Sequence, residues 1–216
     1  VFIMKAFLES VRKPQRGLPL SGLLSTTAGI ILLGFLLGVV QKWLDGTASN
    51  HFPEILQQLD FRNYFGRLAI WILLGTVLSV YSPTPLWAAI NTLCFFLSML
   101  AGYYLYCNYV LGFLPRRYMQ MWIVISCFAF LMAYVCWYAK GKGIVALCLS
   151  SLILGCLLAQ AVNLGRGGIY VYHFLEVLTW LAGVILLRRR PGEFAAEMGL
   201  SVVIAIVYQH TLPHWG

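Results

Sequence analysis

Glu176 is the residue best placed to do chemistry, because it is a single carboxylate within the otherwise uncharged apolar segment 169–187. If a helix begins at Ile169, Glu176 lies about 10 Å along its axis. A carboxylate at that depth in hydrocarbon is costly and by default marks a functional site. His173 precedes it by three residues, so the two side chains share a helical face and can hydrogen-bond or share a proton or ligand.

Three roles are open for Glu176. In the first it is a structural partner, bonded to His173, to a tyrosine hydroxyl or to a loop arginine such as Arg166. In the second it binds a ligand or carries a proton. The third role is metal binding, but the HxxE spacing has no second ligand motif on another segment. We therefore expect no metal centre and no cofactor.

Other polar and aromatic residues are expected at the same ends of the apolar segments as Glu176. Interfacial belts account for most Trp and Tyr in membrane proteins, but one face of YYLYCNY (residues 103–109) has to point inward. Aromatic rings beside a buried carboxylate suit a small organic cation or a flat heteroaromatic molecule. The expected ligand-binding residues are Glu176, His173, Tyr103, Tyr106, Asn108, Trp122, Gln160 and Asn163.

Long apolar segments must position these residues. Hydrophobic residues make up 61% of the 216 and charged residues 10%. Segments that cross about 30 Å of hydrocarbon must be helices or closed barrels, and no period-2 alternation predicts strands. We therefore expect an all-α, polytopic integral membrane bundle of six to seven transmembrane helices. The expected spans are 20–40, 68–81, two arms within 85–143, 144–163, 169–187 and, as the weakest, 194–208.

The chain is expected to form one transmembrane domain, residues 18–216, preceded by a basic amphipathic segment, residues 1–17. Apolar and basic residues alternate in this segment as in a helix that lies on a membrane surface; the alternative is a disordered tail. The segment 194–208 can span if its helix begins around Glu193. Glu193 and Glu197 then lie in the first turn, where the helix dipole favours acids.

Lys and Arg indicate the orientation. With seven spans, more of them fall on the side of the N-terminus, which predicts a multi-pass cell membrane protein with a cytoplasmic N-terminus. The net charge of +8 is spread over helix ends, where it meets lipid head groups, so no nucleic-acid partner is expected. Trp137 and Tyr138 are expected at the membrane interface. The residues expected to dock a partner or anionic lipid are Lys140, Lys142, Arg188, Arg189 and Arg190.

Catalytic motifs are absent from the sequence: neither GxSxG nor HExxH occurs. The protein is therefore not expected to be an enzyme, the open alternative being an intramembrane site in which His173, Glu176 and a cysteine meet. The six cysteines lie in apolar segments without a CxxC pair, which is typical of packing residues.

The layout of compact spans, an outward polar cluster and a long first loop (residues 41–67) resembles the S-components of energy-coupling-factor vitamin transporters. That resemblance implies a small-molecule substrate, a cytoplasmic ATPase pair and a coupling membrane subunit as partners. Residues 71–143, with SPTPLWAAIN, GYYLY and WYAKGKG, are also similar to a set of uncharacterised bacterial membrane proteins, which implies no function.

Two functions follow as expectations. The first is solute binding or transport, with an outward-facing aromatic pocket for a small organic substrate. The second is a non-catalytic scaffold or an accessory subunit of a larger membrane complex, in which charged helix ends and glycine faces contact partner helices.

Overall fold

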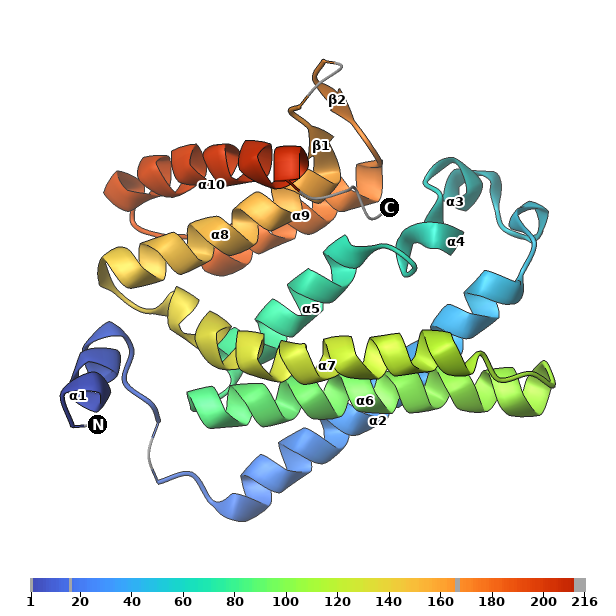
Figure 1. Cartoon of the computed structure of the whole chain (residues 1–216), viewed down its shortest axis with the longest axis horizontal. Coiled ribbons are helices and arrows are strands. Elements are labelled where there is room, and N and C mark those ends of the chain that lie inside the picture. The colour runs from blue at the N-terminus through green and yellow to red at the C-terminus, as the bar shows by residue number, and fades with distance from the viewer. Residues whose placement is uncertain (1, 16, 166–167, 212–216) are drawn as a thin grey trace.

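The computed structural model describes residues 2–15, 17–165 and 168–211, which are almost entirely helical (Figure 1). Besides turns and connections, the described residues form one short antiparallel pair of strands, in which Val162 lies opposite Val171 and Asn163 opposite Tyr170. The elements in chain order are α1 (Phe2–Val11), α2 (Leu20–Gly46), η1 (Ser49–His51), α3 (Glu54–Gln58), α4 (Phe61–Tyr64), α5 (Leu68–Tyr81), α6 (Pro85–Val110), α7 (Arg116–Cys136), η2 (Trp137–Lys140), α8 (Gly143–Ala161), β1 (Val162–Asn163), β2 (Tyr170–Val171), α9 (Phe174–Leu187) and α10 (Pro191–Thr211).

Five helices within the described ranges are long and apolar enough to cross a membrane: α2, α6, α7 extended by η2, α8 and α10. The two others, α5 and α9, have 14 residues each, about 21 Å of helix. All seven lie side by side and alternate in direction (Figure 1). We call the end of the bundle that carries α1 the α1 end, and the end that carries α3, α4 and the β1–β2 pair the loop end.

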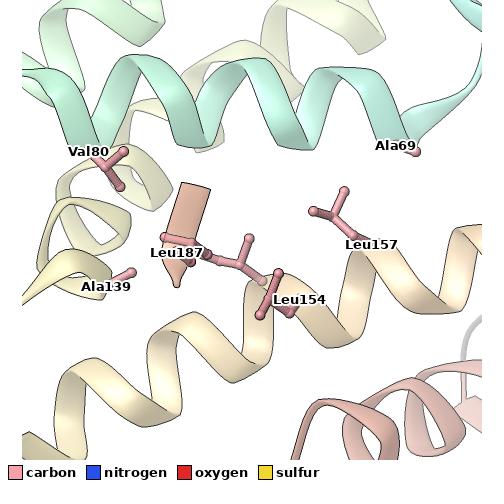
Figure 2. Packing of buried hydrophobic residues seen from close by; sticks show 7 residues of the cluster. Ala69, Val80, Ala139, Leu154, Leu157 and Leu187 are labelled. Atoms are coloured by element: carbon pink, nitrogen blue, oxygen red, sulfur yellow. The ribbon is translucent and has the colours of Figure 1, made fainter. Parts of the chain in front are cut away.

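The short helix α5 lies between two groups of helices, α2, α6 and α7 on one side and α8, α9 and α10 on the other (Figure 1). An apolar cluster fills the space between α5, α8 and α9. Figure 2 shows Leu154 and Leu157 of α8 pointing toward α5, whose Ala69 and Val80 belong to the same cluster. Burying these side chains fixes the two short helices against α8.

Glycines allow α2 and α6 to approach closely. A Cβ atom on Gly38 would overlap the carbonyl oxygen of Met99, and one on Gly102 would overlap that of Phe35. Gly34 faces Phe95 in the same way. The small-xxx-small spacing of Gly34 and Gly38 therefore lies in a helix–helix interface, where backbones pack directly.

At the α1 end, α1 is held against the bundle. Val11 is buried with Trp137 and Tyr138, and the Val11 carbonyl accepts a hydrogen bond of 2.8 Å from the backbone of Lys142. Trp137 and Tyr138 are only 1% and 7% exposed, although the sequence suggested the membrane interface. They are buried because α1 covers them and because Trp137 Nε1 donates to the Ser82 carbonyl at 2.8 Å.

The side chain of Arg12 caps two helix ends. Its guanidinium donates to the carbonyls of Val80 at 2.8 Å and Trp137 at 2.5 Å, and it lies 4.1 Å from the centre of the Trp137 ring. The last carbonyls of a helix have no partner within the helix. Arg12 therefore supplies donors to the C-terminal end of α5 and to η2 from outside both elements.

The glycine contact predicts that Gly38→Ala lowers the stability of the folded protein. The added methyl has to push α2 and α6 apart, a change that costs about 1–3 kcal/mol in packed interiors. Thermal unfolding in detergent measures the effect. Gly29→Ala on the same helix is the control, because a Cβ there meets no atom within 4 Å, and equal melting temperatures for the two variants would contradict the prediction.

Candidate functional site

A pocket lined mostly by aromatic rings opens at the loop end, between α2, α5, α6 and α7. Its enclosed volume is about 20 Å³, enough for about one water molecule. Of the residues expected to bind a ligand, Tyr103 and Trp122 line it. The full lining is Gln41, Gly66, Trp71, Met99, Leu100, Tyr103, Tyr104, Tyr118 and Trp122.

Two polar atoms of the lining residues are buried without a hydrogen-bond partner in the described structure: the Tyr104 hydroxyl and the Trp122 Nε1. Tyr104 is 6% exposed. Buried polar groups are nearly always paired, so such exceptions point to a missing partner. The indole nitrogen only donates, whereas the hydroxyl donates or accepts. The pocket therefore suits a molecule that carries hydrogen-bond acceptors.

The neighbouring Tyr103 hydroxyl is already engaged. It donates to Asp45 Oδ2 at 3.0 Å, and Lys42 Nζ lies 3.4 Å from it. The Lys42 ammonium also lies 5.1 Å from the centre of the Tyr103 ring, a distance typical of a cation–π contact. Tyr103 therefore contributes ring surface to the pocket, and the Lys42–Asp45 ion pair, with 3.9 Å between Nζ and Oδ2, lies nearby.

One wall of the pocket comes from the end of the long loop. The Phe65 carbonyl accepts hydrogen bonds from Gln41 Nε2 at 3.0 Å and from Trp71 Nε1 at 2.8 Å. Gly66 follows and lines the pocket. Backbone at this point is thus fixed to both α2 and α5.

The next residue, Arg67, ties this wall to α9. Its Nε pairs with Glu176 Oε1, its Nη2 lies 3.4 Å from Oε2, and its Nη1 bonds Asp60 Oδ2 at 2.5 Å. The side chains of Arg67 and Glu176 are 8% and 2% exposed. Glu176 lies in the first turn of α9, where the helix dipole stabilises a negative charge. Glu176 therefore positions the loop that forms the wall, as a structural partner of an arginine.

Tyr64 forms a second tie between the loop and α9. Its hydroxyl lies 2.6 Å from Thr179 Oγ1, and that hydroxyl donates to the Leu175 carbonyl. Tyr64 is therefore the donor. Burial raises the pKa of Tyr64 above its usual value, so the phenol keeps this proton at neutral pH.

The expected pairing of His173 with Glu176 is not formed, because the helix begins at Phe174 rather than Ile169. His173 has extended backbone angles just before the helix, and its Nδ1 lies 3.0 Å from the Tyr172 carbonyl. The partner of Glu176 is Arg67. The suggested alternative, Arg166, lies outside the described residues.

Gln160 and Asn163 serve the connections at the loop end. Gln160 Nε2 donates to the Tyr208 hydroxyl at 3.0 Å, which links α8 to α10. Asn163 donates to the Gly168 carbonyl at 2.6 Å and accepts from the Tyr172 hydroxyl at 3.1 Å. Both polar side chains are therefore satisfied away from the aromatic pocket.

The remaining predicted residues lie apart. Tyr106 is half-buried and Asn108 is exposed, and neither lines the pocket. At the α1 end, Lys140 lies over the ring of Tyr81, with 4.7 Å between Nζ and the ring centre. Three further basic residues there, Lys142, Arg188 and Arg190, are exposed, but Arg189 is not.

A second buried acid was missed by the sequence analysis, so Glu176 is not the only one. Glu197 is fully buried in α10, two turns from Pro191, and lies 3.3 Å from Arg189 Nε. The i, i+4 spacing of Glu197, Ser201 and Ala205, the buried residues of α10, is the signal that could have placed it on an inward face.

Together these features define a helical protein with helices long and apolar enough to cross a membrane and a small aromatic pocket at one end. The described residues contain no group of three or more His, Cys, Asp or Glu side chains that could hold a metal ion. No family model matches the chain, and neither the curated proteins nor the solved structures give a match.

The ion pair predicts that Glu176→Met lowers stability by about 3–5 kcal/mol, because it leaves the Arg67 charge buried and without its main partner. Adding Arg67→Met should recover much of that loss, since an apolar pair replaces the ionic one. Unfolding of both single variants and of the double variant measures the coupling. Purely additive losses would contradict the structural role of the pair.

Proposed function

We propose that the protein is an integral membrane solute-binding or transport protein, whose substrate binds in the aromatic pocket at the loop end. The observation that carries the proposal is the pair of buried, unpartnered polar atoms on two residues that line that pocket, Tyr104 and Trp122. Sites for small molecules combine apolar walls with a few such polar groups.

In this proposal all seven helices cross the membrane and the α1 end faces the cytoplasm. The packing of α5 between the two groups of helices and of α9 against α8 and α5, together with the charged groups at their ends, supports their crossing despite their length. Cytoplasmic ends of membrane proteins are enriched in Lys and Arg, and the α1 end carries Arg12, Lys13, Lys140, Lys142, Arg188, Arg189 and Arg190. The pocket then opens to the outside.

A neutral, flat heteroaromatic substrate with acceptor atoms suits the pocket better than an organic cation. The cation hypothesis required a free carboxylate beside the rings, but Glu176 is neutralised by Arg67. Asp45, the carboxylate beside Tyr103, is likewise paired, with Lys42 at 3.9 Å. Flat rings would stack on the aromatic walls while Tyr104 and Trp122 donate to their acceptors.

The pocket, with a volume of about 20 Å³, has to widen to admit such a molecule. Helix α7 carries Tyr118 and Trp122 and packs mainly on α6 and less on α5, so a movement of α7 away from α5 would widen the pocket. The other proposed partners, a cytoplasmic ATPase and a coupling membrane subunit, would meet the exposed basic residues of the α1 end.

Native mass spectrometry of the protein released from its own membrane tests the proposal. We expect a bound small molecule in the wild type and weaker retention in Tyr104→Phe, by up to about tenfold, because one hydrogen bond contributes about 0.5–1.5 kcal/mol. Tyr109→Phe on the same helix is the matched control, since Tyr109 is 80% exposed. Lipid alone in all three samples would contradict solute binding and favour the scaffold or accessory subunit.

A further inference from the structure

At the α1 end, the guanidinium of Arg189 lies near more carboxylates than its single positive charge can neutralise. It donates from Nε to Ser150 Oγ at 3.0 Å, from Nη2 to the Ala139 carbonyl at 2.8 Å and from Nη1 to Glu193 Oε2 at 3.3 Å. The Arg189 side chain is 6% exposed, whereas that of Glu193 is 49% exposed. One carboxylate at the rim of the protein therefore already engages this buried cation.

Glu197, one turn further along α10, competes for the same arginine. Its side chain is fully buried, and its Oε1 lies 3.3 Å from Arg189 Nε, but neither of its oxygens accepts a hydrogen bond in the described structure. The Ser150 hydroxyl also lies near Glu197, but in this arrangement it donates to the Leu147 carbonyl. An ionised carboxylate buried without hydrogen bonds is strongly disfavoured.

Charge counting leads to the same result. With both glutamates ionised, the cluster of Arg189, Glu193 and Glu197 carries a net negative charge that is partly buried. Two carboxylates that share one site do not both ionise readily. Of the two carboxylates, that of Glu197 is fully desolvated, whereas the side chain of Glu193 is about half exposed to solvent.

The cluster at the loop end is a useful contrast. Arg67 also lies between one buried carboxylate, Glu176, and one more exposed carboxylate, Asp60. There both acids accept hydrogen bonds from Arg67, and Asp60 accepts another from Asn63 at 2.8 Å. Both acids at the loop end therefore accept hydrogen bonds, whereas Glu197 accepts none in the described structure.

We propose that Glu197 is a proton-binding site, at which a proton and the Arg189 guanidinium compete for one carboxylate. When Arg189 pairs with Glu193, Glu197 takes a proton from the water at the α1 end. When Arg189 moves fully onto Glu197, that proton returns to the water past the exposed Glu193. One proton is exchanged with solvent in each direction, and no other reactant is needed.

The groups that act on Glu197 come from three elements. Arg189 comes from the α9–α10 connection, Glu193 from the preceding turn of α10, and the Ser150 hydroxyl from α8. From η2 comes the Ala139 carbonyl that holds Arg189. In a transporter this proton would be the coupling ion, an assignment that rests on the proposed function. The proton-binding site itself does not rest on it, because a proton can bind without a solute.

Infrared spectroscopy of the full chain in lipid nanodiscs tests the site through the C=O stretch of protonated carboxyl groups. We expect a band that persists at about pH 7, well above the ordinary pKa of Glu at about 4.3. Glu197→Gln should remove it, and Glu54→Gln, which changes an exposed glutamate, should leave it unchanged. No such band in the wild type, or the same band in a folded Glu197→Gln protein, would overturn the proposal.

If Glu197→Gln does not fold, the variant Glu193→Gln tests the proposal instead. This variant should fold, because Glu193 is half exposed and not part of the core. Without its competitor, Arg189 should stay on Glu197, so the midpoint of the band should fall by about one pH unit. A midpoint equal to that of the wild type would overturn the competition between Arg189 and the proton. Loss or gain of solute in the outer pocket has no bearing on either result.

Discussion

The ends of two short helices impose the constraint on which the rest of the structure depends. Helices α5 and α9 have 14 residues each, too few to reach water at both ends of a membrane, and backbone or charged groups left unpaired in an apolar medium cost several kcal/mol. Charged residues lie at all four ends: Arg67 and Glu176 where the two helices begin, Arg12 at the carbonyl end of α5, and Arg189 just beyond α9. The docked α1, the fixed loop wall and the buried Glu197 all follow from these pairings.

The same arrangement divides the bundle into rigid and less restrained parts. Helices α2 and α6 are locked by backbone contacts at Gly38 and Gly102, and the pocket wall at Gly66 is fixed by the adjoining Phe65 and Arg67. Helix α7 has no comparable attachment near the pocket. Solute entry at the loop end and proton exchange at the α1 end would therefore involve different elements. Helices α5 and α9 lie between these two ends.

Hydropathy alone predicts the all-helical class, and the expected segment 68–81 has the observed bounds of α5. Two of the expected ligand-binding residues, Tyr103 and Trp122, do meet in one pocket. The partner of Glu176 could not be predicted, because Arg67 is 109 residues away in sequence and only tertiary packing selects it among several loop arginines. Glu197 was assigned to the first helical turn on the ground of the helix dipole, since sequence does not show that α8 covers that face of α10.

The position of Arg12 has a consequence for the order in which the protein assembles. Its two carbonyl partners lie 68 and 125 residues further along the chain, so α1 finds its place only after α5, α6 and α7 exist. Chains fold largely from the N-terminus during synthesis. Here the earlier element has to wait for the later ones, and the docking of α1 becomes a late step that closes the bundle.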